Sequence, residues 1–294
     1  MQAYSIAIGI MVLIYMLLAL GLNLQYGYTG LINFGHVAFF AIGAYTSALL
    51  SMHGWPMFAS FVAAVLVASL AAYPIGALSL RLSDDYFAIV TLGFSESVRM
   101  IIDQETWLTN GVQGLAGIPK LFQQMGNAGN GELATLVTLI VCVAGVTFLT
   151  QHLARSPYGR LIQAIRDDET AVQTLGKDPA RLKIQVFMLG AALAGLAGAF
   201  YAHFITYLSP EQFVSLITFY VWIAVIIGGV GRTSGVLLGS ALLIAVLEGS
   251  RFLRDLLPGV EETQMASLRL AFVGLALILF TIYRPQGLLG KRKD

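Results

Sequence analysis

Long apolar runs separated by short polar segments make up most of this chain. A helix that crosses the hydrocarbon core of a bilayer takes about 20 residues, and nine of the runs come close to that length. Backbone in lipid must satisfy its own hydrogen bonds, and the alternating pattern of barrel strands is absent, so we interpret the runs as helices. The predicted spans are residues 3–24, 35–52, 57–80, 86–102, 132–153, 184–208, 214–230, 234–250 and 265–283.

The pattern therefore predicts an all-α integral membrane protein, a polytopic bundle of about nine transmembrane helices in a single domain, residues 1–294. The fourth and seventh runs are short, so either could be tilted or re-entrant. The first run is too long for a signal peptide and is not preceded by basic residues, which favours a retained span.

Composition supports a lipid bilayer as the surroundings. The chain is 57% hydrophobic and 11% charged, with a mean hydropathy of +0.78, whereas soluble domains are about 25% charged. A formal net charge of +1 does not favour a nucleic-acid partner. The single cysteine, Cys142, cannot form an internal disulfide.

Charge is distributed unevenly along the chain. Residues 1–80 contain no Lys, Arg, Asp or Glu, whereas residues 155–183 contain ten. If this charged loop is cytoplasmic, twelve of the seventeen Lys and Arg residues fall on the cytoplasmic side, as the positive-inside rule expects. Nine spans then place the N-terminus outside and the C-terminus in the cytoplasm of a bacterial plasma (inner) membrane.

The segment 103–131 is then the longest external loop. It is rich in glycine and contains Trp107, a side chain suited to the membrane interface. It either meets an external partner or is a solvated linker.

The charged loop carries the pattern of an amphipathic helix over residues 158–176. Pro157 lies near its start, Asp168 interrupts it, and Gly176 ends it. A helix between two spans can act as a lever that docks on a partner, or it can lie on the lipid surface. Three consecutive acidic residues disfavour anionic lipid, so we predict docking. The predicted docking residues are Leu161, Ile165, Arg166, Asp167, Asp168, Glu169, Ala171 and Gly176.

Polar residues interrupt the apolar pattern at two places. Asn23, Asn33 and His36 accompany glycines 27, 30 and 35 between the first two spans, where a glycine-broken helix could expose backbone to a substrate, or a tight turn could join two spans. Glu96 and Arg99 lie three residues apart and share one helical face, either as a structural pair or as a functional one. We take Asn23, Asn33, His36 and Glu96 as candidates for lining a translocation path.

Small residues recur at four-residue spacing in Gly190, Ala194 and Gly198, which favours close helix packing. The glycines at 228, 229, 231, 235 and 239 do not match a nucleotide-binding loop, because Arg232 stands where its lysine would be. No metal-binding or nucleophile motif emerges, so we predict no catalytic residues and no cofactor.

Several motifs, in order, resemble the permease subunits of branched-chain amino-acid ABC importers, of the LivM type. They are Gly21-Leu-Asn-Leu-Gln25, Gly30-Leu-Ile-Asn-Phe-Gly-His36, Tyr86-Phe-Ala-Ile-Val-Thr-Leu-Gly-Phe94, Arg166-Asp-Asp-Glu-Thr-Ala171 with Gly176, Ala194-Gly-Leu-Ala-Gly198, Ile227-Gly-Gly-Val-Gly231 and Tyr283-Arg-Pro-Gln-Gly-Leu288. The loop departs from the family's usual Glu-Ala-Ala by reading Glu169-Thr-Ala171.

The resemblance implies a permease, not an enzyme, that forms the path for branched-chain amino acids. It implies a second permease subunit (a paralogue or another copy), two cytoplasmic ATPase subunits and an external substrate-binding protein. Relatives that carry urea, short amides or aromatic acids remain an alternative, as does a stand-alone secondary transporter. A secondary transporter would need intramembrane carboxylates, for which Glu96 and Glu248 are the candidates.

Overall fold

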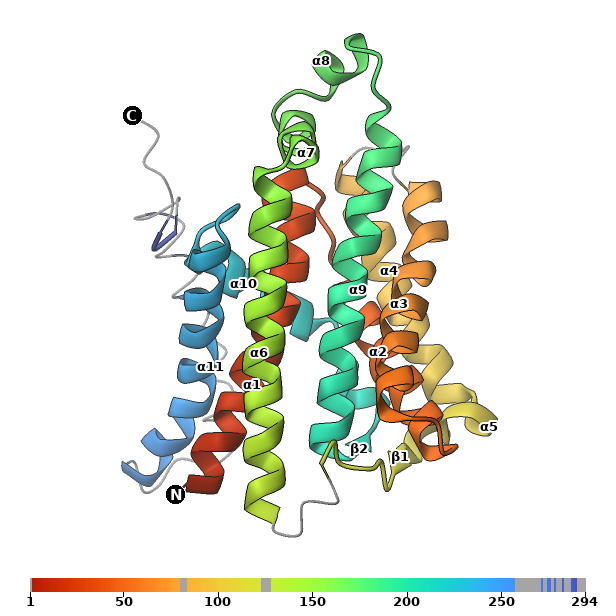
Figure 1. Ribbon diagram of the computed structural model, residues 1–294, viewed down its shortest axis with the longest axis vertical. Coiled ribbons are helices and arrows are strands. Elements are labelled where there is room, and N and C mark those ends of the chain that lie inside the picture. Colours follow the sequence, from red (N-terminus) through yellow and green to blue (C-terminus); the bar gives the residue numbers. More distant parts are fainter. Residues whose placement is uncertain are drawn as a thin grey trace.

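The computed structural model describes residues 2–79, 84–122, 128–256 and 287–289, together with residues 271, 274, 275, 278 and 282. Over these residues the chain is a bundle of long helices that run roughly along one axis (Figure 1). The long helices are α1 (Gln2–Leu22), α2 (His36–Met52), α3 (Met57–Ser79), α4 (Asp84–Gln104), α6 (Ala128–Arg155), α9 (Pro179–Ile205), α10 (Leu216–Gly228) and α11 (Thr233–Leu256).

Short elements lie at the two ends of the bundle. The α7/α8 end carries α7 (Pro157–Asp167) and α8 (Glu169–Thr174), and α8 forms its tip (Figure 1). The opposite end, the β1/β2 end, holds α5 (Thr106–Thr109), β1 (Leu115–Ala116) and β2 (Tyr207–Leu208). The π-helical turn η1 (Asn23–Gly27) follows α1, and two 3₁₀ turns complete the chain, η2 (Gly111–Gln113) and η3 (Pro210–Phe213).

The described helices match the first eight predicted spans. Five segments are long and apolar enough to cross a membrane: Tyr4–Gly27, Met57–Leu78, Asn130–Arg155, Pro179–Ile205 and Pro210–Gly228. His36–Met52 and Thr233–Glu248 are shorter apolar helices. α4 has the length of a span but carries five charged residues. The ninth predicted span, 265–283, lies outside the described residues apart from isolated positions.

Helix α9 lies at the centre of the bundle and packs most extensively against α2 and α3. Glycines make this approach close. A Cβ added at Gly198 would lie 2.1 Å from the carbonyl oxygen of Phe40, and one at Gly43 would lie 2.3 Å from the Cα of Gly195. The close helix packing predicted from the small residues of this span is therefore confirmed.

The glycine cluster after α10 also packs helix against helix. A Cβ at Gly228 would lie 2.2 Å from the carbonyl oxygen of Gly235 in α11. Gly229 and Gly231 have φ angles of 116° and 77°, which glycine adopts without the steric cost that a side chain would add. The interpretation of this cluster as a packing contact and a turn, and not a nucleotide loop, is confirmed.

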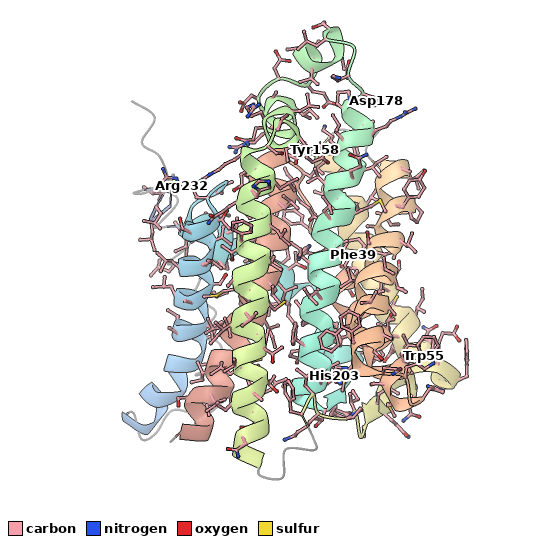
Figure 2. The ribbon with its side chains drawn as sticks, in the orientation of Figure 1. Phe39, Trp55, Tyr158, Asp178, His203 and Arg232 are labelled. Carbon is pink, nitrogen blue, oxygen red and sulfur yellow. The ribbon has the colours of Figure 1, made fainter. Side chains whose placement is uncertain are left out.

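The predicted loop 103–131 is shorter than expected, because α4 continues to Gln104 and α6 begins at Ala128. Its described part is folded onto the bundle and is not a free linker. β1 pairs with β2 antiparallel, with Leu115 opposite Leu208. His203 of α9 completes the attachment: its Nε2 lies 2.8 Å from Ser47 Oγ and its Nδ1 2.8 Å from the Pro119 carbonyl oxygen (Figure 2). This imidazole joins the loop to α2 and α9.

Candidate functional site

The first candidate site is the break between α1 and α2. After the π-helical turn, which lets a helix change direction and often marks functional positions, residues 30–35 run without helical structure until α2 begins at His36. Gly30 permits the turn, with a φ angle of 80°. The backbone amides of Gly30 and Leu31 donate to the carbonyls of Tyr26 and Gln25, each at 3.0 Å.

Two buried amide side chains replace the hydrogen bonds that a continuous helix would have made. Gln25 Nε2 donates to the carbonyl oxygen of Phe187 in α9 at 2.9 Å. Asn33 Nδ2 donates to Gln25 Oε1 at 2.9 Å, and Asn33 Oδ1 accepts from the Gly35 amide at 2.8 Å. Both side chains are 0% exposed. Unpaired backbone polar groups are costly where water is absent, so this pair holds the break in place.

Asn23 and His36 are also buried inside the bundle, each 1% exposed. Asn23 Oδ1 accepts from the Gly231 amide at 2.9 Å, and His36 Nε2 lies 3.1 Å from the carbonyl oxygen of Leu18. The structure thus places Asn23, Asn33 and His36 around the break, each bonded to this chain's own backbone. Gln25, which links Asn33 to the Phe187 carbonyl of α9, belongs to the same group.

The second candidate site is the charged segment at the α7/α8 end, which forms two helices and not the single helix predicted for 158–176. The reason is Asp168, which adopts an extended conformation (φ −156°, ψ 102°) between them. Its Oδ1 accepts from the Ala171 amide at 3.0 Å and so caps α8. Gly176, with a φ of 72°, follows the end of α8, as expected from the sequence.

The buried face of this segment differs from the predicted one. Ile162, Ile165 and Val172 are buried, and Leu161 is half-buried. Ala171 is exposed, and Leu175 is 76% exposed beside the tip. The sequence grouped these two with Ile165 as apolar positions of one helix, whereas the structure exposes both of them.

Replacing Asp168 by alanine is expected to loosen α8, because loss of an N-cap side chain costs about 0.5–2 kcal/mol. Amide hydrogen exchange over residues 169–174 should quicken, while exchange in α7 stays slow. Asp167→Ala, which removes a neighbouring exposed carboxylate, is the matched control. Equal protection of α8 in both variants would contradict the capping role.

Two charged side chains that the sequence assigned to a partner are bonded within this chain. Arg166 Nη1 donates to the carbonyl oxygen of Gly27, in the π-helical turn, at 2.6 Å. Glu169 Oε2 lies 2.6 Å from Nζ of Lys183, a residue of α9 that is only 9% exposed. Asp167, in contrast, is exposed. These two bonds attach the segment to the helix break and to α9.

The third candidate site is a charged pair in α4. Arg99 Nε lies 2.9 Å from Glu96 Oε2, and Ser215 Oγ, just before α10, donates to Glu96 Oε1 at 2.6 Å. Ser95 Oγ lies 3.2 Å from Ser215 Oγ. The side chains of Arg99 and Glu96 are 30% and 39% exposed, so this pair is not enclosed in the bundle.

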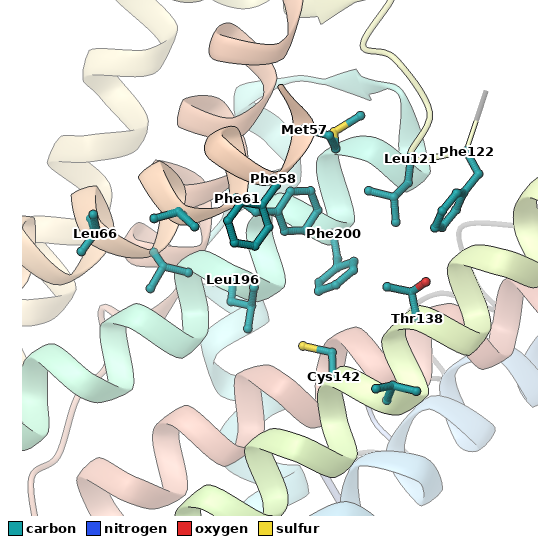
Figure 3. Close-up of a pocket in the computed structure, with 13 residues that line it drawn as sticks. Met57, Phe58, Phe61, Leu66, Leu121, Phe122, Thr138, Cys142, Leu196 and Phe200 are labelled. Carbon is teal, nitrogen blue, oxygen red and sulfur yellow. The ribbon is translucent and has the colours of Figure 1, made fainter. Parts of the chain in front are cut away.

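A cavity of about 620 Å³ opens between α3, α6 and α9 (Figure 3). Its lining is apolar apart from Thr138 and Cys142. Such a lining suits hydrocarbon, because a charged ligand would lose its hydration without gaining partners. Over the described residues, His, Cys, Asp and Glu form no group of three that could hold a metal ion.

Several apolar helices of membrane-spanning length, with a break between the first two helices inside the bundle, are typical of an integral membrane transport protein. The family model for the permease component of branched-chain amino acid transport systems matches residues 5–281, and the chain belongs to this family. The resemblance noted from the sequence motifs is thereby confirmed.

Relatives cover nearly the whole chain. It is 35% identical to the high-affinity branched-chain amino acid transport system permease protein LivM of Salmonella typhimurium LT2, over 97% of this chain and 70% of that protein. It is 28% identical to LivH of Escherichia coli K12, a permease protein of such a system, over 94% of this chain and 91% of that protein.

Two further matches are more distant, one to a protein of an archaeon and one to a solved structure. The chain is 24% identical to the probable branched-chain amino acid transport permease protein LivM of Methanocaldococcus jannaschii, over 95% of this chain and 91% of that protein. A metal-chelate type ABC transporter in an inward-facing conformation superposes with a TM-score of 0.48 and 16% identity, over 95% of this chain and 85% of that one.

Proposed function

We propose that this chain is the membrane-spanning permease subunit of an ATP-driven importer for branched-chain amino acids. The observation that carries the proposal is the family match across residues 5–281. The relatives' names supply the substrate class. The chain has no nucleotide-binding motif of its own, which fits a protein that relies on separate ATPase subunits.

In this proposal the chain crosses the inner membrane nine times, with the α7/α8 end in the cytoplasm. Ten charged residues between 155 and 183 and the balance of Lys and Arg support that orientation. The N-terminus is then outside and the C-terminus inside. The external binding protein delivers substrate at the β1/β2 end, and a second permease subunit completes the path.

The two cytoplasmic ATPase subunits dock on α7 and α8 of the two permeases. Among the predicted docking residues, exposed Asp167 and Ala171 contact the ATPase, while Asp168 and Gly176 shape the segment. Leu161 and Ile165 pack beneath it, and Arg166 and Glu169 anchor it to the bundle. ATP binding closes the ATPases and shifts the population from inward-facing to outward-facing permease.

The path runs beside the break that Asn23 and Asn33 support and along the flank of α4 that carries Glu96. His36 begins the helix that leaves the break. Exposed charge on a span supports the assignment of Glu96 to a hydrated path. Asn23, Asn33 and His36 are buried inside the bundle, which supports a role in holding the wall of that path in position.

The test begins with gentle extraction of the chain from its native membrane and mass spectrometry of what copurifies. We expect two kinds of partner, ATPase subunits and a second permease, and ATP-dependent leucine uptake when the complex is reconstituted with its binding protein. Uptake of urea, a short amide or an aromatic acid in place of leucine would correct the substrate. Transport by the chain alone would refute the importer in favour of a secondary transporter.

A further inference from the structure

Helix α4 carries a charged flank that begins near its middle. Glu96, Arg99 and Asp103 follow one another at spacings of three and four residues and so lie along one side of the helix. The middle of Asp84–Gln104 is residue 94, so Glu96 lies about 3 Å from the helix midpoint at a rise of about 1.5 Å per residue. The stripe runs from there toward the β1/β2 end.

The charge of this exposed pair disfavours a lipid-facing position. Phe87, Thr91 and Val98 bury the opposite side of α4 against the bundle, whereas the Glu96 and Arg99 side chains are 39% and 30% exposed. Charged groups near the centre of a span are costly in hydrocarbon and face the bundle interior or a water-filled cavity. The Glu96 flank of α4 therefore faces water in the assembled permease.

The pair also retains bonding capacity for a ligand. Within the described residues, Arg99 reaches Glu96 through Nε, one of the five N–H donors of a guanidinium group. Glu96 Oε1 accepts from Ser215 Oγ and Oε2 accepts from Arg99 Nε, whereas a carboxylate has about four lone-pair sites. The Glu96 carboxylate and the Arg99 guanidinium are thus held side by side, and both retain hydrogen-bonding sites for a ligand.

We propose that Glu96 and Arg99 form a binding step for the zwitterionic head of an amino acid as it crosses the membrane. The Glu96 carboxylate accepts from the α-ammonium group, and the Arg99 guanidinium donates to the α-carboxylate. Charge-assisted bonds of this kind are the strong ones in proteins. Ser215 keeps the Glu96 carboxylate turned toward Arg99. The inference rests on the proposed function and specifies the ligand chemistry at one point of its path.

The cavity in Figure 3 does not offer this chemistry. Its two polar side chains, Thr138 and Cys142, carry no charge and stand among eleven apolar ones. The zwitterionic head is common to all α-amino acids, whatever their side chain. The pair therefore selects the class of substrate and leaves the choice among side chains to other contacts.

The experiment measures leucine uptake by the complete complex in proteoliposomes, with Glu96→Gln, Arg99→Gln and the double variant. Each single variant is expected to lower the uptake rate about tenfold or more, as loss of one charge-assisted bond implies. Assembly and basal ATP hydrolysis should be unchanged. Ser97→Ala, on the exposed side of α4 beside the pair, is the matched control and should transport normally.

The double variant separates ligand binding from a structural role, because two glutamines can bond to each other but offer no charge to either end of a zwitterion. Uptake as low as in the single variants supports the proposal. Uptake near the wild-type rate, or losses that merely follow loss of assembled complex, would overturn it. A wild-type complex that takes up no leucine would instead refute the proposed function.

A second measurement leaves the pair intact. Leu92 lies one turn before Glu96 on the same flank. Leu92→Cys in a Cys142→Ala background is expected to react with a charged, water-soluble thiol reagent in the membrane, because thiolate chemistry requires access to water. Leucine delivered by the binding protein should slow that reaction. No reaction would overturn the hydrated flank and with it the binding step.

Discussion

Replacing Arg166 by methionine is expected to lower substrate uptake about tenfold or more while the ATPase subunits still bind and hydrolyse ATP. Methionine retains the apolar stem that lies against Gly30 and removes the donors. Arg166 Nη1 bonds to the Gly27 carbonyl at 2.6 Å, which directly connects α7 to the helix break. Bonds to charged groups contribute about 1.5–3 kcal/mol, and about 1.4 kcal/mol is tenfold in an equilibrium constant.

Uptake and ATP hydrolysis should be measured on the same proteoliposomes, so that their ratio reports the coupling. Arg160→Met is the control, because Arg160 lies on the same helix and its Nη1 bonds only locally, to the Arg155 carbonyl at 3.2 Å. A parallel fall of uptake and hydrolysis in the Arg166 variant would mean that the residue serves docking. No change in either would remove Arg166 from the mechanism.

Gly198→Val is expected to prevent stable folding. The added Cβ would lie 2.1 Å from the Phe40 carbonyl oxygen and 2.7 Å from the Ala44 amide nitrogen, and both are backbone atoms that cannot rotate away. Overpacking a core costs about 1–3 kcal/mol, and a clash between two helix backbones belongs at or above the upper end. Thermal unfolding in detergent, followed by size-exclusion chromatography, should show a large loss of the folded peak.

Gly145→Val provides the matched control for this variant. Gly145 also lies within a long helix, α6, but a Cβ built there meets nothing within 4 Å. Both variants make the same chemical change in an apolar helix, so the difference between them isolates the clash. If the two variants unfold at the same temperature, the α2–α9 contact is not what limits stability.

Sequence patterns predicted the helices far better than their interruptions. Apolar runs and small-residue spacing depend on composition along one helix, and they located eight described helices and the close packing of α9. The π-helical turn and the extended stretch after it depend on buried partners such as Phe187, which is 162 residues from Gln25 in the chain. No local pattern shows where a displaced backbone group will find its partner.

The charged segment shows the same limit. Its position, the interruption at Asp168 and its end at Gly176 were readable from the sequence. The sequence did not show that Asp168 separates two helices and caps the second, because an aspartate can also stand within one helix. Arg166 and Glu169 looked like surface charges facing a partner. Their bonds to Gly27 and Lys183 follow from the three-dimensional arrangement of α7, α8 and α9. The sequence signal for Lys183 was only that a cation stands near the start of an apolar helix.

The extended residue between α7 and α8 has a mechanical consequence. Helices α7 and α8 are joined by a single extended residue, Asp168. Bending of one helix is therefore not passed on to the other. A load applied to α8 instead reaches α9 through the Glu169 bond and, through α7, reaches the π-helical turn through the Arg166 bond and the packing of Ile162. The strength of each attachment then determines how far α9 and the π-helical turn are displaced. Weakening one of these attachments would therefore change the direction in which the helices move, and not only the distance.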